Sequence, residues 1–288
     1  MKLVTTRADL RAARTGPAVF VPTMGALHAG HARLIERAAK QSAAHGWTGG
    51  CIVSIFVNPT QFNDPADFAR YPKTLEADLD LCRAAGCSMV YAPAVEDVYP
   101  PDEDVPTPRL PEVATRPGLE DAHRPGHFAG VCRVVKRLFD LVRPAAAVFG
   151  EKDWQQLQVV RAMTQQHGLD IEIVGEPTVR EADGLAMSSR NRFLSAEDRA
   201  RALALSRALC AAAGEKQPPA AEAAMRRVLS QAGIVPEYAV VRDAATLGPP
   251  RGGGVCRALI AARVGDVRLI DNAAFVQRHS EAASALGL

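Results

Sequence analysis

The chain has 288 residues, of which 48% are hydrophobic and 23% charged, proportions ordinary for a globular protein with one large domain or two smaller ones. Its formal net charge of +2 gives no support to a broad nucleic-acid-binding surface, while a local basic pocket for a phosphate is compatible with it. Residues 1–16 lack the continuous apolar core of a secretory signal, and the longest apolar strand-like run, residues 51–57, is too short to cross a bilayer.

The cysteines favour a reducing environment. None is part of a Cys-x-x-Cys pair and most stand in apolar stretches, a pattern that favours buried free thiols over a disulfide framework or a zinc site. The six are Cys51, Cys82, Cys87, Cys132, Cys210 and Cys256. We therefore expect a cytoplasmic protein.

Short β-rich runs alternate with longer amphipathic runs over the first two thirds of the chain. The patterns predict strands at 18–21, 51–57, 89–92, 145–149 and 171–174, and helices at 30–45, 74–86, 127–142 and 154–167. Alternation of this kind predicts an α/β domain with a parallel sheet covered on both faces.

The pattern changes after about residue 176. Two helices are expected at 195–213 and 220–232, followed by strands at 238–242, 256–264 and 267–271, and Gly265-Asp266 joins the last two as a hairpin. Adjacent strands indicate a small α+β unit. We place the domain boundary near Pro177, which gives domains of residues 1–177 and 178–288.

The first segment with chemical content is PTMGALHAGH, residues 22–31. A strand is expected to run into a Gly-bearing turn and then into a helix, at the sheet edge where open α/β folds bind ligands. Gly25 and Gly30 let the backbone approach a phosphate, and the helix N-terminus offers N–H groups to an anion. The segment predicts a nucleotide site.

His28 and His31 are three residues apart, so both rings can face the same side of the first helical turn. Two imidazoles there can donate hydrogen bonds to phosphate oxygens and stabilise the charge that develops as pyrophosphate leaves. The alternative is two ordinary, partly exposed histidines, which is less consistent with the strand–turn–helix context. Metal binding by the pair is disfavoured because no nearby carboxylate completes a ligand set.

Two further segments place polar residues after predicted strands. Asn58 and Gln61 follow the 51–57 strand, and their amides suit recognition of hydroxyl and carboxylate groups. Lys152 follows the 145–149 strand and can hold a triphosphate as a point charge, while Asp153 can contact magnesium or ribose. Taken singly, each is also explained as an ordinary turn or helix start.

A fourth segment, DGLAMSSRN at residues 183–191, sets hydroxyl residues beside Arg190 close to the expected domain boundary. Such a loop can act as a mobile phosphate clamp, and the alternative is a polar interdomain loop. Because this segment and the histidine pair would serve the same phosphate chain, they support each other.

Together these segments resemble the pantothenate synthetase (pantoate–β-alanine ligase) family of the nucleotidylyltransferase superfamily. The resemblance includes RPGHF at residues 124–128 and GDVRLIDN at 265–272, and it follows the order of the chain. It implies a Rossmann-like N-terminal domain with a C-terminal α+β lid, and ATP-dependent ligation of pantoate and β-alanine through pantoyl adenylate, with AMP and pyrophosphate released. It also implies magnesium and a homodimer.

The resemblance carries site residues onto this chain. His31 matches the residue labelled the proton donor, and His28, Lys152 and Arg190 complete the expected catalytic set. Gln61 and Gln156 match the residues that hold pantoate, and Asn58 is expected beside them. Asp78 stands in a stretch that some relatives use near magnesium, although a neighbouring acidic residue of those relatives is Ala77 here. The residues expected to bind ATP are Met24, Gly25, Ala26, Leu27, His28, Ala29, Gly30, His31, Gly150, Glu151, Lys152, Asp153, Val179, Met187, Ser188, Ser189 and Arg190.

Three other functions share parts of this pattern. A nucleotidylyltransferase with a nucleotide-linked product would have the histidine turn but no need of the Gln61 and Gln156 pair. An aminoacyl-tRNA synthetase-like RNA binder is disfavoured by the near-neutral charge and the lack of room for an anticodon-binding domain. A catalytically dead nucleotide-binding regulator is disfavoured by the intact histidines, Lys152 and Arg190.

Overall fold

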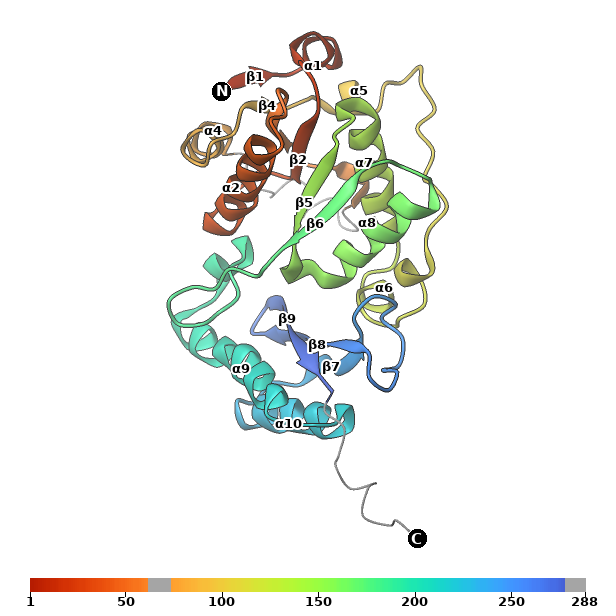
Figure 1. The fold of residues 1–288 in the computed structure, drawn as a ribbon. Coiled ribbons are helices and arrows are strands. Elements are labelled where there is room, and N and C mark those ends of the chain that lie inside the picture. The colour runs from red at the N-terminus through yellow and green to blue at the C-terminus, as the bar shows by residue number, and fades with distance from the viewer. Residues whose placement is uncertain (62–73, 278–288) are drawn as a thin grey trace. The chain divides into compact units, whose positions relative to one another are not determined.

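The computed structural model describes residues 1–61 and 74–277 (Figure 1). The chain divides into two compact units, Met1–Val179 and Arg180–Leu288. The boundary expected near Pro177 stands close to this division. No helix in the described ranges is both long and apolar enough to cross a membrane.

The N-terminal unit is built on a parallel sheet, as the strand–helix alternation predicts. In its described part the sheet has six strands in the order β1-β4-β3-β2-β5-β6. The strands are β1 (Lys2–Val4), β2 (Ala18–Thr23), β3 (Gly50–Ile55), β4 (Met89–Tyr91), β5 (Ala146–Gly150) and β6 (Glu172–Glu176). The expected fold class, a Rossmann-like sheet followed by a small α+β unit, is confirmed.

Helices cover both faces of the sheet (Figure 1). They are α1 (Arg7–Ala13), α2 (Ala29–Ala44), α4 (Leu75–Ala84), α5 (Val95–Val98), α6 (Glu120–His123), α7 (His127–Val142) and α8 (Trp154–Gln166), with 3-10 turns η1 (Pro59–Gln61), η2 (Glu112–Ala114) and η3 (Glu151–Asp153). Phe20 packs in the cluster on the α7 side, whereas its neighbours Val19 and Val21 pack in the cluster on the α2 side. Because successive side chains of β2 pack in different clusters, the strand is buried on both faces.

The order of strands places a topological switch between β2 and β5. From β2 the chain moves outward through β3 and β4, and β5 then returns to the other side of β2. The β2–β5 ladder pairs only Val19 with Ala146 and Phe20 with Ala147, and Pro22, further along β2, has no N–H to donate to a ladder. The carboxyl ends of β2 and β5 are therefore not hydrogen-bonded to each other. Open α/β sheets bind ligands at such a point, beyond the carboxyl ends of the strands at a topological switch.

The C-terminal unit pairs two helices with an antiparallel sheet. It contains η4 (Ser189–Phe193), α9 (Ala196–Ala213), α10 (Pro218–Gln231), β7 (Pro236–Asp243), β8 (Val255–Val264) and β9 (Val267–Val276). Strand β9 continues past Asp271, where the sequence prediction ended. Asp271 is buried and accepts two hydrogen bonds from Arg180, and Asn272 accepts one from Arg257, so these polar residues continue the strand instead of forming a turn.

The first strand and helix were not predicted from the sequence. Strand β1 has three residues, pairs only with β4 at the sheet edge, and buries only Val4. Helix α1 is short and buries only Leu10. Neither element contains enough apolar residues to show a period. The expectation of free thiols is confirmed, and five of the six cysteines are buried, with Cys210 exposed.

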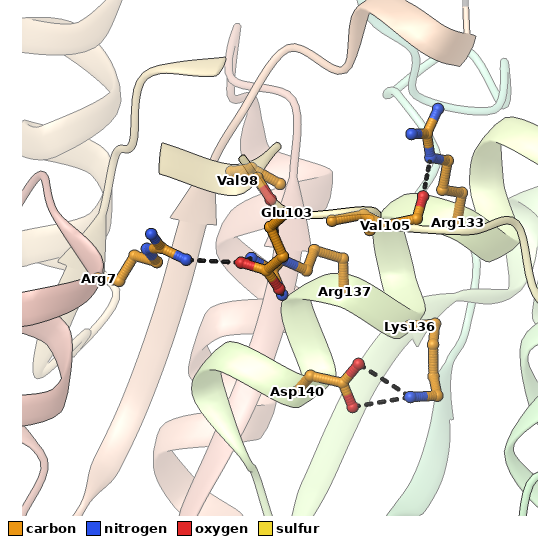
Figure 2. Close-up of polar contacts among 8 residues, drawn as sticks. All are labelled: Arg7, Val98, Glu103, Val105, Arg133, Lys136, Arg137 and Asp140. Atoms are coloured by element: carbon orange, nitrogen blue, oxygen red, sulfur yellow. Dashed lines mark hydrogen bonds and ion pairs between the residues drawn. The ribbon is translucent and has the colours of Figure 1, made fainter. Parts of the chain in front are cut away.

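Val98, Glu103 and Val105 lie beside α7 and are bound by arginines (Figure 2). The Nε of Arg137 donates to the Val98 carbonyl oxygen at 2.8 Å, and its terminal nitrogens donate to both carboxylate oxygens of Glu103 at 2.5 and 2.8 Å. Arg7 binds the same carboxylate at 2.8 Å. The pairing fixes the segment that leads to η2 and α6.

Replacing Arg137 with methionine is expected to lower the free energy of unfolding by about 1–3 kcal/mol, because a buried carbonyl loses its donor. The matched control is Lys136→Met on the same helix, whose exposed pair with Asp140 (2.8 Å; Figure 2) contributes less than about 0.5 kcal/mol. Urea denaturation of both variants measures the difference. Equal losses would show that the Arg137 pairing adds no more than a surface ion pair.

Candidate active site

The turn that follows β2 has a backbone conformation that few residues adopt. The Thr23 hydroxyl donates to the Ser54 carbonyl oxygen at 2.7 Å and accepts from the Gly25 N–H at 3.2 Å, which ties the end of β2 to β3. Gly25 and Ala26 then take φ values of +82° and +51°. A left-handed alanine costs about 1–2 kcal/mol, so contacts elsewhere must hold the turn.

The histidine pair begins helix α2. His28 is the N-cap residue, and its Nδ1 accepts from the Gly30 N–H at 3.1 Å, while the His28 N–H donates to Nδ1 of His31 at 3.3 Å. The ring centroids are 4.2 Å apart. Because both Nδ1 atoms accept hydrogen bonds, the network assigns the proton of each neutral ring to Nε2. The two rings therefore have Nε2–H groups as their donors.

The environment of His31 keeps its ring neutral. Burial, reinforced by His28, lowers the pKa of His31 to about 3, with Asp153 acting in the opposite direction and Lys152 in the same one. At neutral pH the neutral ring can donate a hydrogen bond from Nε2. It lacks the second ring proton that an imidazolium would release as an acid. The same interactions show that η3, after β5, comes close to the start of α2.

Turn η3 contains two charged residues that the sequence analysis expects in the site. Lys152 and Asp153 are half-buried, with 3.7 Å between Nζ and Oδ2. Gly150 closes β5, and a Cβ added to it would lie 3.9 Å from the Cδ2 of Leu34 on α2. Glu151 opens η3 beside Gly175 of β6. The β2 and β5 turns, far apart in sequence, thus meet at the topological switch.

The turn after β3 is held against α7. Asn58 is 1% exposed, its Nδ2 donates to the Gly130 carbonyl oxygen at 3.2 Å, and its Oδ1 accepts from Thr60 and from the Tyr99 hydroxyl. From the sequence, Asn58 was expected to contact substrate. In the structure its amide is instead engaged in supporting the turn, which leaves Gln61 as the half-exposed amide of this segment.

Gly130 explains how η1 comes so close to α7. A Cβ at this position would lie 2.5 Å from the Thr60 carbonyl oxygen and 3.0 Å from the Gln61 Cα. Only glycine permits this approach of backbone to helix. This role was not predicted from the sequence, although an isolated glycine within a strong helical stripe was a usable signal.

His127 is a further residue to which the sequence assigned no role. It is buried at the start of α7, and its Nδ1 has no hydrogen-bond partner among the described residues. Burial and nearby Arg124 lower its pKa to about 3, and it interacts with the Gln61 backbone and with Asp153. His127 therefore interacts with residues of both η1 and η3.

The remaining expected residues of the N-terminal unit are distributed around these turns. Gln156 is half-buried in the first turn of α8, whereas neighbouring Gln155 is buried and holds the backbone of Val113 and Glu120. Met24, Leu27 and Ala29 lie along the β2 turn and the start of α2, and Val179 ends the unit. Asp78 lies in the first turn of α4, and Tyr71–Lys73 of its stretch fall outside the described residues.

The expected phosphate clamp belongs to the C-terminal unit. Ser188 caps η4 by accepting from the Arg190 N–H at 3.3 Å. Asn191 is buried and donates to the Ala186 carbonyl oxygen at 3.0 Å, which fixes the loop that includes Met187 and Ser189. Arg190 is exposed, and no carboxylate in the described part of this unit lies within ion-pair distance of it.

The lowered pKa values of His31 and His127 make the free energy of unfolding depend on pH. Between pH 6.5 and about 3 the unfolded chain binds a proton at His31 and another at His127 that the folded chain does not bind, so the free energy of unfolding falls as pH falls. Each histidine is expected to contribute about 1.4 kcal/mol per pH unit. Urea denaturation from pH 6.5 to 4.5 should show this slope reduced in His31→Gln and in His127→Gln, and reduced additively in the double variant. An unchanged slope in the double variant would contradict the assignment.

Comparison with known proteins identifies the family. The family model described as "Pantoate-beta-alanine ligase" matches residues 2–274. A pantothenate synthetase of Thioalkalivibrio sulfidiphilus is 47% identical over 284 residues, covering 94% of this chain and 97% of that protein. One of Nocardioides sp. is 48% identical over 266 residues, covering 88% of this chain and 77% of that protein.

Solved structures agree with this family. The pantothenate synthetase of Thermus thermophilus has a TM-score of 0.85 and 43% identity, covering 95% of this chain and 99% of that chain. The pantoate–beta-alanine ligase of Francisella tularensis, solved in complex with beta-gamma ATP and beta-alanine, has a TM-score of 0.76 and 29% identity, covering 97% and 99%. With its parallel sheet, its histidine turn and these similarities, the chain belongs to the pantoate–beta-alanine ligase family.

Proposed function

We propose that this protein ligates (R)-pantoate and β-alanine to pantothenate with ATP, through a pantoyl adenylate, and releases AMP and pyrophosphate. Its family and the names of its relatives support the overall reaction. The structural observation that supports it best is the pair of Nε2–H donors on His28 and His31, placed beside Lys152 at the β2–β5 switch. The Francisella relative, solved with beta-gamma ATP and beta-alanine, supports those two substrates.

In the first step, an oxygen of the pantoate carboxylate attacks the α-phosphorus of ATP. The bond from this phosphorus to the bridging oxygen breaks, and pyrophosphate leaves with the electron pair. Negative charge grows on the leaving group, where the histidine donors and the Lys152 ammonium would stabilise it. With its pKa near 3, His31 acts as a hydrogen-bond donor and not as an acid at neutral pH.

In the second step, the neutral amine of β-alanine attacks the acyl carbon of the adenylate. The bond from this carbon to the phosphate oxygen breaks, AMP leaves with the electron pair, and the nitrogen loses a proton to water. Gln61 and Gln156 are proposed to hold pantoate by its hydroxyl and carboxylate groups. In this proposal Asn58 and Gly130 do not contact pantoate, and they act by fixing the position of Gln61.

The C-terminal unit is proposed to close as a lid, with Ser188, Ser189 and Arg190 on the phosphates. Exclusion of water would protect the adenylate from hydrolysis. Magnesium would neutralise phosphate charge as part of the ATP complex. No group of three or more His, Cys, Asp or Glu in the described residues could hold a metal ion, so the described chain contributes no metal cage of its own. A cytoplasmic location is proposed from the pattern of the cysteines, and a homodimer from the family resemblance alone.

The proposed function is tested by measuring which carboxylic acid supports ATP–pyrophosphate exchange. Exchange is expected with pantoate and ATP in the absence of β-alanine, and AMP is expected to accumulate when β-alanine is added. A nucleotidylyltransferase would instead give a stable nucleotide-linked product, and a dead regulator would bind ATP without exchange. Formation of ADP would refute the proposed reaction.

A further inference from the structure

The carboxylate of Asp78 accepts hydrogen bonds from the backbone of the Gly25–Leu27 turn, which precedes the histidine pair. Asp78 is 2% exposed. Its Oδ2 accepts from the Ala26 N–H at 3.0 Å and its Oδ1 accepts from the Leu27 N–H at 2.7 Å. The Thr74 hydroxyl donates to Oδ2 at 3.2 Å. A charged acceptor thus meets two consecutive backbone donors that come from a turn 51 and 52 residues away in sequence.

The turn needs such an anchor. Gly25 and Ala26 both have positive φ, a conformation that an alanine leaves readily unless contacts hold it. Consecutive N–H groups in such turns converge on an anion, and here the anion is a side chain of the protein. Because His28 follows the turn directly, the exit direction of the turn sets where the histidine pair lies.

Metal binding does not fit the same carboxylate. Both oxygens of Asp78 already accept hydrogen bonds, and the residue is closed to solvent. Magnesium keeps several waters and needs ligands in a near-octahedral arrangement, for which a carboxylate 2% exposed has no space. The magnesium role expected for Asp78 from the family resemblance is therefore inconsistent with its surroundings.

We propose that Asp78 is a positioning residue for the adenylation step: its buried carboxylate holds the Gly25–Leu27 turn so that His28 and His31 face ATP. The inference rests on the proposed function. It also implies that the Ala26 and Leu27 amides are occupied by Asp78, so the phosphates are recognised by the side-chain donors and not by these two N–H groups.

The test compares Asp78→Asn with Asp80→Asn, an exposed aspartate on the same helix that pairs with Arg83. The asparagine keeps the shape of the side chain but sets an amide N–H against a backbone N–H. We expect the kcat of pantoate-dependent exchange to fall about 10- to 100-fold, with the KM for pantoate and the magnesium concentration for half-maximal exchange unchanged. Adding Ala26→Gly, which removes the left-handed penalty, should restore part of the loss.

A readout without turnover separates this inference from the proposed function. The imidazole ¹⁵N resonances of His28 and His31 should shift in Asp78→Asn and not in Asp80→Asn, whatever reaction the protein catalyses. Unshifted resonances with wild-type exchange would overturn the inference, as would full recovery at high magnesium. If Asp78→Asn does not fold, Thr74→Val removes one donor to the same oxygen. A two- to fivefold loss of kcat supports the anchor, and wild-type kcat contradicts it.

Discussion

Replacement of His31 with alanine is expected to lower pantoate-dependent ATP–pyrophosphate exchange about 100- to 1,000-fold. Removing one preorganised donor to a developing negative charge has an effect of this size in other enzymes. The variant also removes the Nδ1 acceptor of the His28 N–H, so one hydrogen bond of the capping box at the start of α2 is lost. Exchange of labelled pyrophosphate into ATP at saturating pantoate measures the loss.

Two variants of His31 separate hydrogen-bond donation by the side chain from proton transfer. His31→Gln keeps an N–H donor near the Nε2 position, and its exchange should exceed that of the alanine variant. His45→Ala, at the exposed C-terminal end of the same helix, is the control and should exchange like the wild type. If glutamine and alanine were equally inactive while both folded, hydrogen-bond donation would not explain the role of His31.

The second large effect is expected at Gly130. An alanine Cβ would stand 2.5 Å from the Thr60 carbonyl oxygen, so η1 must move by about 1 Å, a displacement that can cost about 100-fold in rate. We expect kcat/KM for pantoate to fall by this order while ATP binding, measured by calorimetry, is retained. Alanine is the better helix former, so helix propensity alone would stabilise the variant.

Gly252→Ala is the matched control, because a Cβ there meets no atom within 4 Å and its φ is not positive. Its kinetic constants should equal those of the wild type. A Gly130→Ala variant with unchanged pantoate kinetics would show that η1 does not depend on close contact with α7. The position of Gln61 would then lose its structural explanation.

The positions of the chemical segments could be predicted because they depend on local pattern. The apolar runs predicted to end at Val21, Val57 and Phe149 end within two residues of the observed strands, and parallel strands bring such ends to one edge of a sheet. The histidine pair follows one of these ends. Helix α7, His127–Val142, was predicted with the bounds that the structure gives, because its apolar stripe is long and regular.

What the sequence did not show depends on partners distant along the chain. Asp78 reads as an ordinary acidic residue in a first helical turn, and only the fold shows that it accepts from Ala26 and Leu27. Asn58 reads as a ligand-binding amide, yet its donor and acceptor atoms are engaged with Gly130, Thr60 and Tyr99. The structure shows both side chains hydrogen-bonded to the backbone of other segments of the N-terminal unit.

The adenylate is the central claim, and transfer of ¹⁸O tests it most directly. Pantoate labelled with ¹⁸O in its carboxylate is incubated with ATP and β-alanine, and the AMP is analysed by mass spectrometry. Attack of the carboxylate on the α-phosphorus predicts one ¹⁸O in AMP and none in pyrophosphate. Unlabelled AMP, or label in inorganic phosphate with ADP as the product, would contradict the mechanism.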